Sequence, residues 1–172
     1  MSSAMPDGGA QVVGAGHPPL RVVQAVHRDL AARGQVVLGG SGLLYALGLV
    51  DSVGDWDLVT DVPSEQVAGV LADRSLVAQR LGGDLPGFAT AALFRVDAGD
   101  HQIDVLVDFA IRVAGRVTAI PARPWRTWQG MTLARPEDWA LAYELMGREE
   151  KAALLRDWLL AHPGPASSGP DE

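Results

Sequence analysis

Hydrophobic residues recur along residues 20–162 with two periods, and these periods predict the order of helices and strands. A spacing of three to four residues predicts helices, and a spacing of two predicts strands that bury one face. In the first half of the chain the predicted elements are a helix over 20–33, a strand over 35–38, a glycine turn over 39–42 that opens a short helix ending near Gly48, a strand over 55–60 and a helix over 63–73. The first helix is expected to end in a left-handed cap at Gly34.

The second half of the chain continues with strands and closes with two helices. A tight turn over 97–100 joins two of the strands, which should therefore pair as an antiparallel hairpin. Pro121 and Pro124 confine residues 116–121 to a short edge strand. The pattern predicts strands over 76–81, 89–96, 101–109 and 116–121, a helix after Pro136 that carries Trp139 to Met146, and a helix over 148–162. The expected fold class is α/β (α+β), a mixed β-sheet flanked by helices with a C-terminal helical pair.

Length and composition favour one globular domain. The chain has 172 residues, of which 48% are hydrophobic and 20% charged, enough for one core of ordinary size. Residues 1–18 and 163–172 are rich in small residues and proline, so we expect a disordered leader and a disordered tail around a single domain over 19–162. No signal peptide or long apolar run is present, which predicts a cytoplasmic protein that does not bind a membrane.

Charge and cysteine content exclude several kinds of site. The formal net charge of -7 and the sequence pI of about 5.0 argue against a surface that binds nucleic acid through many non-specific phosphate contacts. The chain contains no cysteine, which excludes disulfides, thiolate zinc sites and cysteine nucleophiles, and its four histidines are scattered. Any metal ion would therefore be held by oxygen ligands.

Three aspartates form the candidate metal site. Strand side chains alternate faces, so Asp55 and Asp57 point the same way while Trp56 points the other way. Asp104 stands in the middle of an apolar strand, where an unpaired carboxylate is unfavourable, so a cation shared with Asp55 and Asp57 would be a suitable partner. Magnesium is commonly held by one or two carboxylates together with the phosphates of a bound nucleotide.

The glycine turn over 39–42 is the candidate phosphate site. Backbone N–H groups at the start of a helix can bind phosphate oxygens when no side chain blocks their approach, and Ser41 adds a hydroxyl group. Neither the P-loop pattern nor the dinucleotide fingerprint is present. The turn is therefore neither a Walker-type nor a dinucleotide-binding turn.

The order of these motifs resembles a known family. Residues 38–41 (Leu-Gly-Gly-Ser), 55–57 (Asp-Trp-Asp) and 103–105 (Ile-Asp-Val) resemble the polymerase-beta-type nucleotidyltransferase superfamily, whose signature is a hydrophobic residue followed by glycine and Gly or Ser, then Asp-x-Asp, then a third carboxylate on a neighbouring strand. The resemblance spans residues 35–109. The segment 136–151 is similar to the small bacterial branch that includes abortive-infection-type toxins and minimal nucleotidyltransferases.

The resemblance implies a nucleotidyltransferase-like fold and Mg-dependent transfer of a nucleoside monophosphate from an NTP to an acceptor hydroxyl. It implies that the acceptor is a protein, an RNA or a small molecule, although no acceptor-recognition motif follows the core. Metal binding and catalysis would fall to Asp55, Asp57 and Asp104: the first two would bind a pair of magnesium ions, and Asp104 would hold the catalytic ion and help to deprotonate the acceptor. Nucleotide binding would fall to Gly39, Gly40, Ser41 and Lys151, with Arg148 near the phosphates.

Simpler interpretations remain for the same residues. Asp55 and Asp57 suit a strand-entry turn with two solvated acids, and Arg148 and Lys151 suit a solvated helix face. A catalytically inactive nucleotidyltransferase-like binding module, such as an antitoxin or assembly partner, is the alternative function. The tryptophans at 125, 128, 139 and 158 are expected to pack in the core, Asp61 and Asp108 to cap or to be solvated, and His101 to flank a turn.

Overall fold

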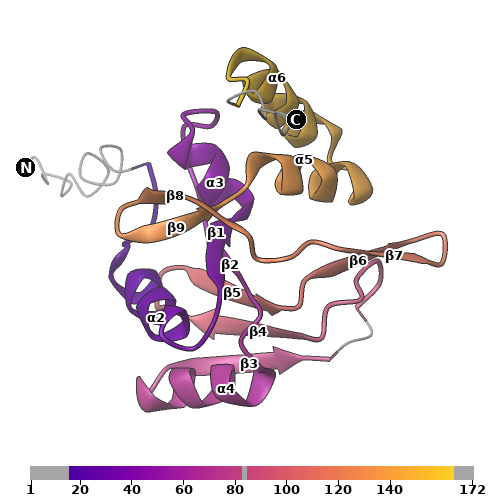
Figure 1. Cartoon of the computed structure of the whole chain (residues 1–172). Coiled ribbons are helices and arrows are strands. Elements are labelled where there is room, and N and C mark those ends of the chain that lie inside the picture. The colour runs from indigo at the N-terminus through magenta and orange to yellow at the C-terminus, as the bar shows by residue number, and fades with distance from the viewer. Residues whose placement is uncertain (1–15, 83–84, 165–172) are drawn as a thin grey trace, which may run out of the picture.

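The computed structural model describes residues 16–82 and 85–164 (Figure 1). The predicted leader and tail lie outside these residues, except for 16–18 and 163–164. The helices are α2 (Arg21–Ala31), α3 (Gly40–Ala46), α4 (Ser64–Asp73), α5 (Pro136–Leu145) and α6 (Glu149–Ala161). The strands are β1 (Val36–Gly39), β2 (Trp56–Thr60), β3 (Val77–Leu81), β4 (Ala92–Asp97), β5 (Gln102–Val107), β6 (Ala110–Val113), β7 (Arg116–Ala119), β8 (Pro124–Trp128) and β9 (Met131–Ala134).

A mixed sheet with the order β3-β4-β5-β2-β1-β9-β8 forms the centre of the molecule. β2 pairs in parallel with β5, and β1 pairs in parallel with β9, whereas the other neighbours are antiparallel. The hairpin turn between β4 and β5 is confirmed, with Gly99 at a φ of 97° and its N–H donating to Oδ1 of Asp97 at 2.9 Å. The expected mixed sheet is therefore present.

The helices lie in two groups on either side of the sheet. α2 and α4 contact each other, with α2 against β1, β2 and β9 and α4 against β3. α5 and α6 pack together as the expected C-terminal pair, above the sheet in Figure 1. Val67, Val70 and Leu71 of α4 are buried, as their spacing predicts. In the described part of the chain, no helix has both the length and the apolar character needed to cross a membrane.

One part of the core lies between the sheet and the α2/α4 pair, and residues of α3, α5 and α6 also belong to the core. Trp56 and Leu58 of β2 and Ile103 and Val105 of β5 are completely buried. Each fully buried side chain of this kind stabilises the folded state by about 2 kcal/mol, because its apolar surface is removed from water. Because strand residues alternate, burial of these four residues turns Asp57 and Asp104 to the opposite face of the sheet.

The region after β5 differs from its prediction. The expected edge strand over 116–121 is shorter and pairs with β6 in a separate two-stranded sheet, which extends from the body in Figure 1. β6, β8 and β9 were not predicted. Two turns explain the difference: residues 114–115 and 129–130 have both central φ angles positive, which closes hairpins without an Asn-Gly or Asp-Gly signal.

The expected left-handed cap at Gly34 is wrong. α2 ends at Ala31, its C-cap residue Ala32 has ordinary helical angles, and Gly34 is not among the residues with positive φ. Gly34 instead allows a close approach, because a Cβ there would lie 2.6 Å from Oδ1 of Asp61. That oxygen accepts a hydrogen bond from the Gln35 N–H at 2.7 Å. Asp61 therefore caps the backbone N–H group just before β1, in line with its predicted role.

Candidate active site

A row of facing residues crosses the middle of the sheet. Gly39 of β1 lies opposite Asp57 of β2, Asp57 lies opposite Asp104 of β5, and Asp104 lies opposite Arg95 of β4. Facing residues on neighbouring strands have their Cβ atoms about 5 Å apart and project from the same face. The register therefore brings together two of the three predicted carboxylates, together with an arginine.

Asp57 lies directly under the start of α3. Gly40 is the first residue of that helix, with a φ of 58°, and a Cβ there would lie 2.2 Å from Oδ2 of Asp57. Any residue other than glycine would meet both the strained backbone and the carboxylate. The second glycine of the predicted turn is thus required by its approach to Asp57.

The environment of Asp57 opposes its negative charge. Loss of water around the carboxylate, together with the neighbouring charges of Asp104 and Asp55, raises the pKa of Asp57 to about 7. Lys151 and Arg95 act in the opposite direction without cancelling the effect. A cation bound beside Asp57 would relieve this repulsion and hold the carboxylate in its ionised form.

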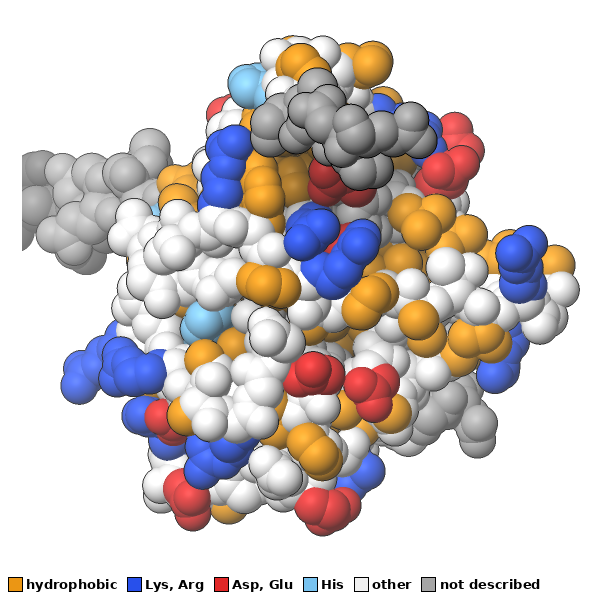
Figure 2. Space-filling view, in the orientation of Figure 1, with side chains coloured by type: hydrophobic (Ala, Val, Ile, Leu, Met, Phe, Trp, Pro, Cys, Tyr) orange, Lys and Arg blue, Asp and Glu red, His pale blue; other side chains and the backbone are white. Residues whose placement is uncertain are grey.

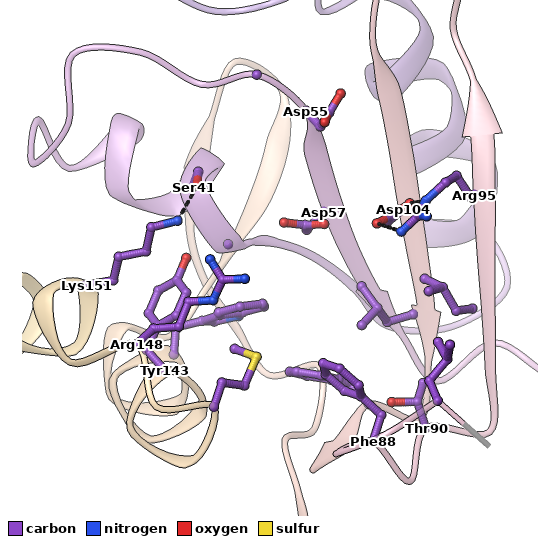
Figure 3. A pocket seen from close by; sticks show the side chains of 18 residues that line it. Ser41, Asp55, Asp57, Phe88, Thr90, Arg95, Asp104, Tyr143, Arg148 and Lys151 are labelled. Carbon is purple, nitrogen blue, oxygen red and sulfur yellow. Dashed lines mark hydrogen bonds and ion pairs between the residues drawn. The ribbon is translucent and has the colours of Figure 1, made fainter. Parts of the chain in front are cut away.

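Asp55 and Asp104 each have a hydrogen-bonding partner. Oδ1 of Asp55 accepts the backbone N–H of Gln102 at 2.7 Å, which leaves its second oxygen outside that contact. Both oxygens of Asp104 accept hydrogen bonds from Arg95, from Nε at 3.0 Å and from Nη2 at 3.2 Å. The partner predicted for Asp104 was a metal ion, whereas the structure places the Arg95 guanidinium there (Figure 3).

The opposite wall of the site comes from α3, α5 and α6. Lys151 of α6 donates a hydrogen bond from Nζ to Oγ of Ser41 at 3.2 Å, and this ammonium lies 5.5 Å from the centre of the Tyr143 ring. Burial and the charge of Asp57 raise the pKa of the Tyr143 hydroxyl, and a hydrogen bond with Ser41 partly offsets the rise. Lys151 therefore faces Ser41 rather than forming only a solvated helix face. Glu144 of α5 pairs with Arg156 of α6.

These two walls enclose a cavity of about 510 Å³, which is within the usual size of a small-molecule site. Its polar end holds the three carboxylates, with Arg95, Arg148 and Lys151 around them (Figure 3). Its other end is apolar and lies between the sheet and α5; the apolar lining residues are Leu85, Phe88, Leu93, Leu106, Phe109, Trp139 and Met146. Thr90 also lines this end, and its hydroxyl donates to the Ala110 carbonyl and accepts from the Ala110 N–H.

The predicted site residues fall into two groups. Gly40, Ser41, Asp55, Asp57, Asp104 and Lys151 line the cavity together, as does Arg148. Gly39 lies behind the cavity wall, where its missing side chain is replaced by the Trp139 indole; a Cβ at Gly39 would lie 2.3 Å from the indole. α3 has seven residues, so its helix dipole is short, and the side chains that could bind a phosphate here are those of Ser41 and Lys151.

Sequence reasoning missed Arg95 and Tyr143. The sequence does contain a signal for Arg95: the turn over 97–100 fixes the register of the hairpin, and this register places Arg95 opposite Asp104. Tyr143 reaches the site only because α5 packs over β1, which no local pattern indicates. Trp125 and Trp158 form an edge-to-face pair with ring centres 5.6 Å apart, in line with the packing role expected for the tryptophans.

Two of the three predicted carboxylates could hold one oxygen-preferring cation. In the ranges 16–82 and 85–164, no three Asp, Glu or His side chains are arranged to hold a metal ion. Asp55 and Asp57 remain as a pair on one side of β2, and Mg²⁺ needs only one or two protein carboxylates when phosphates complete its shell. These two residues would hold the ion.

The fold is similar to that of two solved proteins, although no protein-family model and no curated protein sequence matches the chain. A Thermotoga maritima protein described as a candidate nucleotidyltransferase aligns with a TM-score of 0.59 and 22% identity, over 83% of this chain and 93% of that chain. The antibiotic-resistance factor ANT(2'')-Ia aligns with a TM-score of 0.51 and 14% identity, over 81% of this chain and 85% of that chain.

Both alignments cover the greater part of each chain, and together with the mixed sheet and the C-terminal helical pair they define the architecture. The chain has a nucleotidyltransferase-like fold.

Proposed function

We propose that this protein is a nucleotidyltransferase that transfers a nucleoside monophosphate from an NTP to an acceptor hydroxyl. The observation that carries the proposal is the position of Asp57, which faces Asp104 across the sheet, lies under Gly40 and shares a cavity with Ser41 and Lys151. Carboxylates for a cation and a lysine for phosphates thus line the same space. The similarity of fold to nucleotidyltransferases agrees with this assignment.

In the proposed reaction the triphosphate lies between the two walls of the cavity. Lys151 and Ser41 bind the oxygens of the leaving pyrophosphate. Asp55 and Asp57 would hold a magnesium ion, which would neutralise charge on the phosphates. The acceptor oxygen forms a bond with the α-phosphorus while the bond to the bridging oxygen breaks, and pyrophosphate leaves with that electron pair. Asp104 accepts the hydroxyl proton, because each carboxylate oxygen has a second lone pair beyond the one that Arg95 uses.

The direct test is transfer of labelled nucleoside monophosphate with Mg²⁺ and each of the four NTPs, comparing the wild type with Asp57→Asn. We expect transfer and pyrophosphate release by the wild type, loss of at least a hundredfold in the variant, and loss on chelation of the metal. A variant with unchanged turnover would overturn the assignment. Thermal unfolding of both proteins controls for misfolding.

The acceptor we favour is a protein hydroxyl or a small hydroxyl compound rather than RNA. The net charge is -7, and acidic side chains are interspersed with basic ones on the face in Figure 2. A polyanion would therefore find little sequence-independent attraction. The cavity also has an apolar end, which suits a small organic group. Labelled transfer to each class of acceptor distinguishes them, and efficient transfer to an RNA end alone would contradict this preference.

The resemblance of residues 136–151 to abortive-infection-type and minimal nucleotidyltransferases supports a cytoplasmic toxin–antitoxin role, in which the acceptor is a hydroxyl of a partner protein. Co-expression with the product of a neighbouring gene, followed by intact-mass measurement, tests this role. A mass increase of one nucleoside monophosphate on the partner is the expected result. Growth and partner mass that are both unaffected would exclude it.

One observation favours a second function, that of a catalytically inactive binding module. Arg95 occupies both oxygens of Asp104, which would disable the third carboxylate if the pair never allowed a proton to transfer. Calorimetry with the four NTPs and Mg²⁺ separates the two functions. Binding of no nucleotide favours the module, and binding with turnover favours the enzyme.

A further inference from the structure

Arg95 and Asp104 form a fixed pair on neighbouring strands. They face each other in the antiparallel register of β4 and β5, and two N–H groups of the guanidinium meet the two carboxylate oxygens at 3.0 and 3.2 Å. Side-chain exposure is 41% for Arg95 and 23% for Asp104, and both residues line the cavity, so the pair is partly exposed at the cavity wall. Planar two-point contact of this kind holds a carboxylate in one orientation.

The pair stands on the far side of Asp57 from Lys151. The order of facing residues across the sheet is Asp57, Asp104, Arg95, while Lys151 and Ser41 lie across the cavity on α6 and α3. In-line displacement places the acceptor opposite the leaving pyrophosphate. With pyrophosphate at Lys151, the acceptor side of the site is the side of Asp104 and Arg95 (Figure 3).

A second metal ion on this side would need Asp104 as a ligand. Both oxygens of Asp104 already accept hydrogen bonds from a permanently charged group, and an ion placed between Asp57 and Asp104 would be repelled by the guanidinium. Throughout the described residues, no group of three acids or histidines could hold a metal ion. The site thus provides for one divalent cation, at Asp55 and Asp57.

We propose that the Arg95 guanidinium, paired with Asp104, takes the place of a second metal ion on the acceptor side of the active site. The protein then binds one divalent metal ion with its nucleotide. The inference rests on the proposed function, because it concerns the site at which an NTP would bind. Arg95 acts through Asp104 as a positioning residue: it balances the charge of the carboxylate that faces Asp57 and fixes the oxygen that accepts the hydroxyl proton.

The test is the number of Mn²⁺ ions bound per chain in the presence of a non-hydrolysable NTP, measured by electron paramagnetic resonance and calorimetry. We expect one ion for the wild type and for Arg95→Lys, which keeps the charge. We expect a second ion, bound at least tenfold more tightly than any second ion of the wild type, for Arg95→Met. Arg80→Met is the matched control, because Arg80 lies on β3 and pairs with Glu65 away from the cavity.

A second variant tests the proposal without removing the arginine. Asp104→Asn should retain the one Mn²⁺ ion with an affinity reduced less than fivefold, whereas Asp57→Asn should lose it by at least a hundredfold. Two ions of similar affinity in the wild type, an unchanged single ion in folded Arg95→Met, or a large loss in Asp104→Asn would each overturn the inference. Failure of the wild type to bind any nucleotide with Mn²⁺ would instead contradict the proposed function itself.

Discussion

Gly40 and Asp57 approach so closely that a Cβ at position 40 would lie 2.2 Å from Oδ2 of the aspartate. The contact joins the first residue of α3 to the middle of β2, and it depends on a φ of 58° at Gly40. The backbone beside Ser41 is thereby held next to the carboxylate row. The proposed phosphate site and the proposed cation site are therefore linked through one glycine.

Gly40→Ala is expected to abolish nucleotide binding. The new Cβ must displace the Asp57 carboxylate, and the left-handed backbone adds about 1 kcal/mol of strain. We expect at least a hundredfold loss of NTP affinity by calorimetry and a decrease of 1 to 3 kcal/mol, roughly, in the free energy of unfolding.

Gly69→Ala is the matched control for this substitution. Gly69 lies within α4, has open space around its Cβ position and is not among the residues with positive φ. Alanine there should stabilise the protein by up to about 1 kcal/mol and leave NTP affinity unchanged. Nucleotide affinity that survives Gly40→Ala would show that the close approach is unimportant.

Asp57 should make the metal-free protein less stable as the pH rises. Its pKa in the folded protein is about 7, above the ordinary value of 3.8. The folded state therefore binds the proton more tightly than the unfolded state, and this contribution is complete below about pH 4 and lost as the pH rises through 7. The full shift corresponds to about 4 kcal/mol, but Asp57 is half-buried and open to the cavity, so we expect on the order of 2 kcal/mol.

Asp57→Asn removes that titration. The variant should be more stable than the wild type at pH 8 and show a flatter dependence of unfolding free energy on pH between 4 and 8, measured by urea denaturation. Added Mg²⁺ should stabilise the wild type at pH 8 and not the variant. Parallel pH profiles for the two proteins would show that Asp57 is not the group responsible.

Most elements of the sheet could be predicted because their apolar residues keep one period. β5 alternates over its whole length and β2 alternates from Trp56 to Leu58, so the sequence alone places Asp57 and Asp104 on the face opposite the core. β8 and β9 could not be found in this way: β8 contains Pro124 and has no buried alternate face, and β9 has four residues. Their position beside β1 comes from a long-range parallel pairing that leaves no local signal.

The site was predictable in its acids and less so in its bases. The apolar neighbours of Asp104 indicated that it needs a partner, and the structure shows Arg95 as one. The metal ion at Asp104 stays a prediction. In the sequence, an arginine that lines the site and an arginine exposed to solvent occupy the same alternate position of a strand. Only the residue that the arginine faces on the neighbouring strand distinguishes these two cases.

Lys151→Met should weaken nucleotide binding while leaving the fold intact. The ammonium lies 3.2 Å from Oγ of Ser41 and would lose that contact in exchange for phosphate oxygens, which it attracts more strongly. We expect NTP affinity to fall about tenfold, or about 1.4 kcal/mol, by calorimetry. Added salt should weaken wild-type binding more than variant binding.

Arg156→Met is the control for the loss of a positive charge on α6. Arg156 pairs with Glu144 and does not line the cavity, so its removal should change NTP affinity less than twofold. An equal effect of both substitutions would mean that Lys151 acts only through the net charge of the helix. An unchanged affinity in Lys151→Met would remove it from the phosphate site.

Gly39 and Trp139 should be strongly coupled in a double-mutant cycle. A Cβ at Gly39 would lie 2.3 Å from the indole, which is 4% exposed, so Gly39→Ala should destabilise the protein by roughly 3 kcal/mol and weaken NTP binding by moving α5 and Tyr143. Trp139→Leu alone leaves a cavity and should lower stability by roughly 2 to 4 kcal/mol. In that background the alanine finds space, so its effect should shrink by more than about 1 kcal/mol. Additive unfolding free energies from urea denaturation would mean that the packing of α5 on β1 does not require glycine at position 39.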